Sequence, residues 1–228
     1  MKSPIILAMD TDSLDEAKRW IELTTGSVGI YKLGLEFFLK FGRQGVLEIA
    51  QETECKIFLD LKLHDIPNTV GAATAQVAPL KPQFLTVHAS GGSAMVNAAV
   101  VNAPDTDITA VTILTSLSQT DMDLIGFSGT PQSRAIELAK LSVAAGAKAI
   151  VCSPLEIEGI RSAIPDYVSI ITPGIRPKGT AGSDDQKRVM DPKSAISAGA
   201  NYLVIGRPIT GAADMRAAAK SIFEEALS

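Results

Sequence analysis

The chain has 228 residues, of which 46% are hydrophobic and 20% are charged, and its formal net charge is −4. This composition is typical of a globular protein with a sizeable core and excludes an intrinsically disordered chain. The negative charge, with no basic stripe, argues against nucleic acid as a partner, so an anionic ligand would need a local cationic pocket.

Short runs rich in β-branched residues alternate with longer amphipathic or alanine-rich segments along the whole chain. The expected strands are Ile5–Met9, Gly29–Leu33, Lys56–Leu61, Phe84–His88, Ile108–Leu114, Ala149–Cys152, Val168–Thr172 and Tyr202–Ile205. The expected helices are Leu14–Thr25, Glu36–Thr53, Asn68–Ala78, Ser93–Asn102, Gln132–Ala145, Leu155–Ala163, Pro192–Ala198 and Ala212–Ala226. Strict alternation of strands and helices predicts a parallel sheet.

Eight strand–helix units in a chain of 228 residues predict a TIM (β/α)8 barrel that forms a single domain over residues 1–228. The competing doubly wound sheet usually has fewer strands, and no Gly-x-Gly-x-x-Gly turn follows the first strand. Two long connections, Thr115–Pro131 and Pro173–Asp191, each follow a strand. We expect them at the catalytic end of the barrel, where long loops tend to be functional lids.

The cysteines and the start of the chain bear on its cellular setting. Cys55 and Cys152 are too few for a disulfide framework, and neither lies in a metal-type spacing. The first residues lead into an apolar run of about six residues, far below the roughly 18 that a membrane span needs, and no signal-peptide pattern follows. We therefore expect a soluble, cytoplasmic protein with no membrane partner.

The segment from Asp60 to Thr69 concentrates charge at the end of an apolar run that begins at Ile57. Residues two apart in a strand share a face, so Asp60 and Lys62 are expected to project side by side. A carboxylate and an ammonium at the end of a buried strand carry a desolvation cost. Their presence there indicates a functional use.

Polar residues also stand at the ends of most other predicted strands. They are Asp10, Lys32, His88, Thr115 and Ser116, Pro173 to Arg176, and Gly206 and Arg207. The carboxyl ends of barrel strands converge on one mouth. A lone aspartate at a strand end is about as often a loop cap, but Asp10 and Lys32 together with the Asp60–Lys62 pair favour an active site, since interior lysines are rare.

Several other chemistries find little support. A strand-end histidine such as His88 is more often a satisfied interior residue than a functional one. With His64 and His88 on different units and no acidic residue at ligand spacing, we expect no dedicated metal site. No Gly-x-Ser-x-Gly elbow supports acyl transfer.

The eighth unit resembles a phosphate site. Barrels often bind phosphate on the loops after strands seven and eight. Gly206 allows close approach of the backbone, and Arg207 offers a fork of donors that matches a phosphoryl group. A surface arginine in an ordinary turn is an equal alternative for this pair alone, and the glycine-containing loop after strand seven favours the phosphate site.

The segment Asp60-x-Lys62-x-x-Asp65-Ile66-Pro67-Asn68-Thr69 resembles the active-site signature of the orotidine 5'-phosphate decarboxylase family. Further segments resemble that family's in the same order: Asp10, Tyr31-Lys32-Leu33-Gly34, Thr115-Ser116, Pro173-Gly174-Ile175-Arg176, Gln186 and Gly206-Arg207. The resemblance spans nearly the whole chain. The third-strand signature is highly specific, whereas the Thr115-Ser116 and Gln186 assignments are looser.

The resemblance implies a carboxy-lyase that needs no cofactor and no metal. Its reaction would convert orotidine 5'-monophosphate to uridine 5'-monophosphate and CO2 in de novo pyrimidine biosynthesis. Lys62 would donate the proton to carbon 6 of the pyrimidine, and Asp60 would lie beside the departing carboxylate. Lys32 would complete an alternating array of charges.

The resemblance also implies a homodimer with shared active sites, in which Asp65, Ile66 and Thr69 reach into the neighbouring subunit's site. The remaining implied substrate contacts are Asp10 at the ribose, Thr115 or Ser116 and Gln186 at the pyrimidine and phosphate, Arg176, Gly206 and Arg207 at the phosphate, and Pro173.

Two alternatives stay open. A magnesium-dependent sugar-phosphate decarboxylase on a related barrel would share an Asp-x-Lys-x-x-Asp pattern. Such relatives typically carry an acidic metal ligand on the second strand, where this chain has Lys32, and the extension from Ile66 to Thr69 also points away from them. The second alternative is a catalytically silent barrel that only binds a nucleotide. The buried charged residues count against it, because binding alone does not need them.

Overall fold

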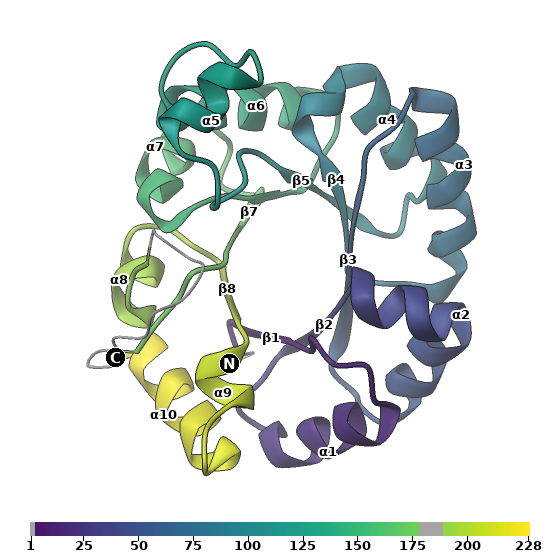
Figure 1. Cartoon of the computed structure of the whole chain (residues 1–228), viewed down its shortest axis with the longest axis vertical. Coiled ribbons are helices and arrows are strands. Elements are labelled where there is room, and N and C mark those ends of the chain that lie inside the picture. Colours follow the sequence, from purple (N-terminus) through teal and green to yellow (C-terminus); the bar gives the residue numbers. More distant parts are fainter. Residues whose placement is uncertain (1–2, 178–188) are drawn as a thin grey trace.

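The computed structural model describes residues 3–177 and 189–228. Its strands form one closed parallel sheet in chain order, in which β8 (Tyr202–Ile205) returns to pair with β1 (Ile5–Ala8). Figure 1 looks along the barrel and shows the helices packed around its outside. The predicted TIM (β/α)8 barrel is confirmed.

All the predicted strands are present. Between β1 and β8 lie β2 (Ile30–Gly34), β3 (Lys56–Leu63), β4 (Phe84–His88), β5 (Asp107–Val111), β6 (Ala149–Val151) and β7 (Ser169–Thr172). Two ends differ from the prediction by more than one residue. β3 runs two residues further, to Leu63, and β5 stops at Val111 rather than Leu114, because the chain beyond Val111 turns to form a wall of the cavity described below.

The helices also follow the predicted order. They are α1 (Leu14–Thr24), α2 (Leu35–Gln51), α3 (Pro67–Val77), α4 (Gly92–Asn102), α6 (Pro131–Ala144), α7 (Ile157–Arg161), α8 (Pro192–Ser197) and α10 (Met215–Ala226), with short 3-10 turns at Ala78–Leu80, Ala89–Gly91 and Pro154–Glu156. Two further helices, α5 (Gln119–Leu124) and α9 (Arg207–Thr210), were not predicted.

Side-chain caps determine where several helices begin. The Ser13 hydroxyl accepts the Glu16 N–H at the start of α1, and Asp214 accepts the Ala217 N–H at the start of α10. The cap at Asp214 explains why α10 starts three residues later than predicted. In α5, Ser118 and Asp121 form a reciprocal capping box. Such a box gives partners to two backbone N–H groups, here those of Ser118 and Asp121. It stabilises a helix that is too short to show a clear helical period in its sequence.

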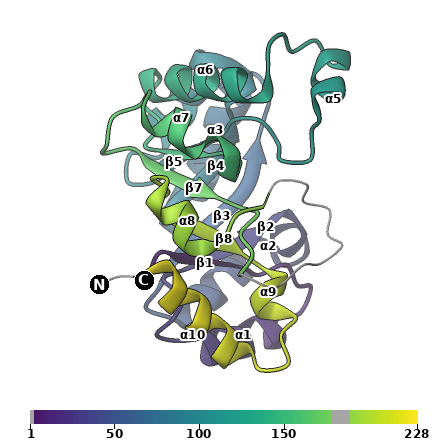
Figure 2. The ribbon, with the colours of Figure 1, turned by 90° about the vertical axis from the view of Figure 1, so that its left-hand side faces the viewer.

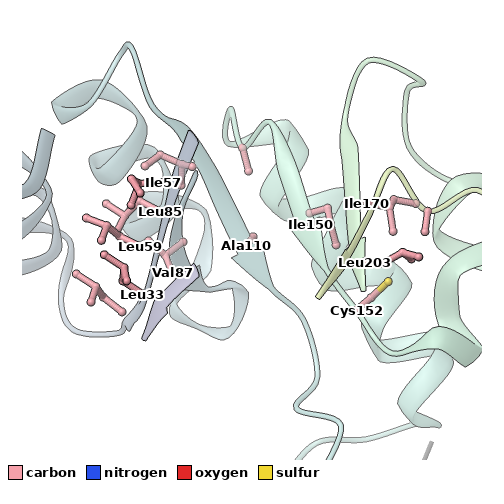
Figure 3. Packing of buried hydrophobic residues seen from close by; sticks show 14 of the residues in the cluster. Leu33, Ile57, Leu59, Leu85, Val87, Ala110, Ile150, Cys152, Ile170 and Leu203 are labelled. Atoms are coloured by element: carbon pink, nitrogen blue, oxygen red, sulfur yellow. The ribbon is translucent and has the colours of Figure 1, made fainter. Parts of the chain in front are cut away.

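The core has two layers. Inside the barrel lies a cluster of Ile6, Ile30, Phe58, Phe84, Ala149 and Ile171. The larger cluster lies between the sheet and the helices, and in Figure 3 Leu33, Leu59 and Leu85 point from the strands toward the neighbouring helices. Because the inner cluster fills the barrel, a ligand can enter only from an end of it.

Aromatic rings make much of the inner layer. Phe84 packs edge-on against Phe58, with ring centroids 5.6 Å apart, and against Tyr202 at 5.4 Å. Edge-to-face pairs of this kind add stability beyond the area that they bury. This plug forms the floor beneath the residues at the carboxyl ends of the strands.

The first long connection, and the described ends of the second, follow the carboxyl ends of β5 and β7. The first carries α5, which in Figure 2 projects away from the body of the barrel. In the second, Ile175 bridges to Met190, and the Arg176 N–H donates to the Met190 carbonyl at 3.0 Å. The glycine-containing centre of that connection, in which Gln186 falls, lies outside the described residues, so its predicted role as a lid stays a prediction. No helix in the described part of the chain has the length and apolar character to cross a membrane.

The inner plug gives a stability prediction. Phe84 is 1% exposed. We expect Phe84→Ala to lower the free energy of unfolding by about 3–5 kcal/mol, because it leaves a cavity inside the barrel. Tyr167→Ala, which truncates an aromatic side chain that is 76% exposed, should change it by less than about 0.5 kcal/mol. Equal losses in urea unfolding would show that the plug is not what stabilises the barrel.

Candidate active site

A cavity of about 290 Å³ opens at the carboxyl end of the barrel. Nine of the predicted site residues line it: Asp10, Lys32, Asp60, Lys62, Thr115, Pro173, Arg176, Gly206 and Arg207. Its other walls are mainly apolar and come from Ala8, Phe58, Val111, Ile113, Leu114, Val151, Cys152, Gly174 and Val204. The structure therefore brings most of the predicted residues, from strands far apart in sequence, to one place.

Four charged side chains form a chain of contacts of alternating sign at this mouth. Lys32 Nζ lies 3.2 Å from Asp10 Oδ1 and 3.5 Å from Asp60 Oδ2. Lys62 Nζ donates to both carboxylate oxygens of Asp60, at 2.8 Å each. We call Asp10, Lys32, Asp60 and Lys62 the charge array.

Strand periodicity places part of the charge array. Ile30 and Phe58 belong to the inner cluster. Lys32 and Asp60 are two residues further along the same strands, so they project on the same side, above the plug. The pairing of β2 with β3 sets Lys32 beside Phe58 and Gly34 beside Asp60, which brings the lysine within reach of the carboxylate.

Lys62 follows a different backbone path from the one predicted. Its φ is +48°, in the left-handed region. The register with β4 shifts at this point, since Leu59 pairs with Leu85 and Leu63 with Val87. A non-glycine residue in this conformation costs about 1–3 kcal/mol. Asp60 and Lys62 do lie side by side, but a β-bulge and not a regular strand puts them there.

The carboxyl group of Asp60 is held in its ionised form. Burial by itself would raise its pKa. The charges of Lys32 and Lys62, with hydrogen bonds from Lys62 and Thr86, outweigh burial, so the pKa of Asp60 lies below its usual value. The site therefore keeps a negative charge beside Lys62 at neutral pH.

His88 lies next to the charge array and is half-buried, with its ring centroid 5.3 Å from that of His64. Burial lowers the pKa of His88, and the nearby His64 and Lys62 lower it further, against the opposing charge of Asp60. His88 is accordingly neutral at neutral pH. The sequence favours a satisfied interior histidine at this strand end, and the structure places a half-buried histidine there.

The opposite side of the cavity carries two guanidinium groups. Arg176 follows β7 and Arg207 follows β8, and both line the cavity. Arg176 Nη1 also donates to the carbonyl of Ile175 at 2.9 Å. Gly206 has no side chain, and an added Cβ would touch Ala8 at 3.5 Å, so this stretch of backbone comes close to the cavity wall. The structure thus brings Arg176, Gly206 and Arg207 to one cavity, and their role in binding an anion stays a prediction.

Four predicted residues lie away from the chain's own cavity, and all of them are exposed. Asp65 accepts the Ile66 N–H at 2.6 Å, Ile66 is 66% exposed, and Thr69 and Ser116 face outward. The predicted place of the first three in a neighbouring subunit's site stays a prediction. Thr115 lines the cavity and Ser116 does not, which favours Thr115 for the looser assignment.

Sequence reasoning missed some residues of the site. Thr86 on β4 hydrogen-bonds both Asp60 and the backbone of Lys62. Thr86 stands two residues after Phe84 in the same strand, so the two-residue period of a strand could have predicted that its side chain also faces the barrel interior. Cys152 lines the cavity but is buried, and burial together with the nearby Glu156 raises the pKa of its thiol. Cys152 is therefore an apolar wall and not a nucleophile.

The carboxylates of the charge array are paired with lysine side chains. Across residues 3–177 and 189–228, no group of three or more His, Cys, Asp or Glu side chains is positioned to hold a metal ion. The carboxylates of Asp10 and Asp60 both contact the Lys32 ammonium.

Comparison with known proteins is consistent with this site. Residues 3–222 match the orotidine 5'-phosphate decarboxylase / HUMPS family. The chain belongs to this family. The orotidine 5'-phosphate decarboxylase of Thermobifida fusca is 47% identical over 225 residues, covering 99% of this chain and 96% of that protein. That of Sphingopyxis alaskensis is 48% identical over 224 residues, covering 97% and 98%.

A solved structure agrees with the same family. The crystal structure of orotidine 5'-phosphate decarboxylase from Lactobacillus acidophilus matches this fold with a TM-score of 0.87 and 33% identity, over 100% of both chains. The resemblance to the orotidine 5'-phosphate decarboxylase family predicted from the Asp60–Thr69 signature is thus confirmed.

The lowered pKa of His88 gives a prediction about stability. In the folded protein the pKa of the His88 imidazole lies below 6.5, whereas in the unfolded chain it is near 6.5, the ordinary value for histidine. As the pH falls through that range the unfolded state takes up the proton first, so stability decreases. Between about pH 7.5 and about pH 5.5, wild type should lose more unfolding free energy than His88→Gln. Parallel losses in urea titrations would contradict the account.

Proposed function

We propose that this protein is an orotidine 5'-phosphate decarboxylase, a carboxy-lyase that forms uridine 5'-monophosphate and CO2 without a cofactor in de novo pyrimidine biosynthesis. The observation that carries the proposal is the Lys62 ammonium, held at 2.8 Å from both oxygens of an ionised Asp60 at the floor of a cavity that also holds two guanidinium groups. Proteins up to 48% identical over nearly the whole chain bear this name.

The reaction needs positive charge at one ring atom. When the bond between carbon 6 and the carboxylate breaks, its electron pair stays on carbon 6 in the plane of the ring, where no cofactor spreads it. A preorganised cation at that atom is then the main means of lowering the barrier. Lys62 supplies this cation, transfers a proton from Nζ to carbon 6, and regains a proton from solvent after product release.

Asp60 serves the same step in two ways. Its carboxylate fixes the Lys62 ammonium through two hydrogen bonds, so no reorganisation is needed as charge develops. Its negative charge also lies beside the position of the substrate carboxylate. Repulsion between the two is relieved as CO2 leaves. Lys32 holds Asp60 from the other side and links it to Asp10, which we assign to the ribose hydroxyl groups.

The phosphate is remote from the reacting carbon and contributes through binding. Arg207 and Arg176, with the backbone at Gly206, form the cationic side of the cavity. A guanidinium matches a phosphoryl group with paired donors. Binding energy obtained there can hold the pyrimidine against the charge array, in a position that the ring alone would not keep.

Thr115 and Pro173 line the cavity as further substrate contacts. We assign Gln186, outside the described residues, to the same ligand.

We further propose a homodimer with shared sites, in which Asp65, Ile66 and Thr69 complete the neighbouring subunit's cavity. Exposed apolar side chains support this: Ile66, just before α3, and Leu39, in α2, are 66% and 80% exposed. Contact with a second chain would remove such apolar surface from water. The two cysteines are free thiols, which fits the reducing cytoplasm where we place the enzyme.

The alternatives lead to different outcomes in one assay. Loss of orotidine 5'-monophosphate absorbance should proceed in excess chelator, because the proposed cation and proton donor is the Lys62 ammonium and the carboxylates of Asp10 and Asp60 are already paired with Lys32. Turnover that stops with chelator would favour a magnesium-dependent sugar-phosphate decarboxylase. Binding of uridine 5'-monophosphate without any turnover would leave a catalytically silent nucleotide-binding barrel.

The role of Lys62 gives the strongest mutational prediction. Lys62→Ala should lower kcat by at least about 10⁴-fold, because both the cation and the proton donor are lost. Binding of uridine 5'-monophosphate, measured by calorimetry, should stay within about tenfold of wild type. Lys56→Ala, at the exposed start of the same strand, serves as the control and should leave kcat unchanged. Appreciable turnover by Lys62→Ala would overturn this assignment.

Arg207 should act on binding more than on chemistry. Loss of its charged hydrogen bonds costs about 1.5–3 kcal/mol, so Arg207→Ala should raise KM for orotidine 5'-monophosphate by about 10- to 100-fold. Arg19→Ala, an exposed arginine on α1, should leave KM unchanged. A normal KM for Arg207→Ala would move the phosphate site elsewhere.

Shared sites can be tested by mixing two inactive variants. Lys62→Ala and Asp65→Ala each lack one group of every site. In a heterodimer of the two, the site on the Asp65→Ala subunit holds its own Lys62 and receives Asp65 from its partner. After subunit exchange at equal amounts, half of the dimers carry one such site, and about a quarter of wild-type activity should return. No recovery after verified exchange would show that each site is complete within one chain.

A further inference from the structure

Thr86 of β4 contacts both members of the Asp60–Lys62 pair through a single hydroxyl. Its Oγ1 accepts the Lys62 backbone N–H at 2.8 Å and donates to Asp60 Oδ1 at 2.9 Å. The side chain is 0% exposed. One buried oxygen therefore links the backbone of the proposed proton donor to the carboxylate that holds its ammonium.

The β-bulge explains why a side chain is needed at this point. Between the pairs Leu59–Leu85 and Leu63–Val87, three residues of β3 face Thr86 alone. The extra residues of a bulge fall outside the regular ladder of backbone hydrogen bonds. A buried N–H without a partner is costly. The Thr86 hydroxyl takes the place of a strand carbonyl as the acceptor for the Lys62 N–H.

Thr86 does not line the cavity. It lies below the charge array, two residues after Phe84 of the inner plug on the same face of β4. Any effect on the reaction must therefore pass through Asp60 and Lys62. A β-branched side chain has few χ1 rotamers, so its hydroxyl is held in one direction.

We propose that Thr86 is a positioning residue of the decarboxylation, which holds the left-handed backbone of Lys62 and the carboxylate of Asp60 in the one arrangement that aims the ammonium at carbon 6. This inference rests on the proposed function. Without the hydroxyl, the Lys62 backbone loses its tie to β4, and the carboxylate loses the donor that fixes its rotation. The ammonium then follows a carboxylate that is free to turn.

The chain offers a matched control. Thr109 of β5 pairs with Thr86 in the sheet register and is also 0% exposed. Its hydroxyl donates to the backbone carbonyl of Asp107 at 2.9 Å, and no described hydrogen bond joins it to the charge array. Thr109→Val removes a buried hydroxyl of the barrel interior, as Thr86→Val does, without touching the site.

The first test compares kcat with KM in purified Thr86→Val, Thr86→Ser and Thr109→Val. Displacement of a reacting group by about 1 Å can cost roughly 100-fold in rate, so Thr86→Val should lose about 10- to 100-fold in kcat with KM changed by less than about threefold. Thr86→Ser keeps the hydroxyl and should recover most of kcat. Thr109→Val should keep wild-type kcat even where its unfolding free energy is lowered.

The pH profile gives a readout that a general loss of stability would not change. Asp10, Lys32, Lys62 and His88 all lie around Asp60, and they stay the same in Thr86→Val. Loss of the Thr86 hydrogen bond removes one of the interactions that lower the pKa of Asp60. The acid limb of the pH profile of kcat/KM should therefore move to higher pH in Thr86→Val. It should stay at the wild-type position in Thr86→Ser and in Thr109→Val.

The outcomes separate this inference from the proposed function. Wild type without turnover of orotidine 5'-monophosphate would overturn the proposed function, and the role of Thr86 with it. Wild-type turnover, with Thr86→Val no slower than Thr109→Val and no shift of the acid limb, would overturn the role of Thr86 alone. Should Thr86→Val not fold, Thr86→Ser against Thr86→Ala repeats the comparison with a single hydroxyl as the difference, and equal kcat values would overturn the inference.

Discussion

The ionised carboxylate of Asp60, enclosed between two lysine ammonium groups, is the interaction around which the site is built. Taking these charges out of water costs several kcal/mol for each ion, and the cost is offset only when the groups are paired and hydrogen-bonded. Asp60 meets this condition through Lys32, Lys62 and Thr86. Lys32 comes from β2, Lys62 from the bulge of β3 and Thr86 from β4, so the parallel pairing of these three adjacent strands brings the partners together.

The rest of the molecule keeps this arrangement dry below and open above. Phe58 and Phe84 fill the barrel beneath the charges, so water cannot reach them from the opposite end. Arg176 and Arg207 lie on the far side of the cavity, where binding of a remote anion can hold a ring over the ammonium. The backbone strain is placed at Lys62, the residue to which we assign proton transfer. Strain of this kind persists only where the surroundings determine the conformation, and here the Thr86 hydroxyl does so.

Much of this could be predicted from the sequence, because it follows from periodicity. Alternation of strands and helices gives the barrel, and the two-residue period of strands carries Lys32 and Asp60 to the same side as Ile30 and Phe58. The family was indicated by the resemblance of the segment from Asp60 to Thr69 to a known active-site signature. These features repeat along the chain or stand close together in it, so they are visible without the fold.

Other features depend on tertiary contacts and could not be predicted. The bulge at Lys62 is set by the register of β3 against β4, and the role of Thr86 follows from that register. The six-residue helix α5 is too short to show a helical period, although its Ser118–Asp121 capping box was present in the sequence. The predicted contact of Asp65 and Ile66 with a partner chain rests on the family resemblance, because strand and helix periodicity describe only the packing within one chain.

The central claim is that Lys62 delivers a proton to carbon 6, and deuterium exchange tests it most directly. If the proton passes between Lys62 and carbon 6, the reverse transfer must also occur on bound product. Wild-type protein incubated with uridine 5'-monophosphate in D2O should exchange the hydrogen at carbon 6 and leave the one at carbon 5 in place, as followed by proton NMR. Lys62→Ala should show no exchange at carbon 6. Exchange that persists in Lys62→Ala at the wild-type rate would contradict the account.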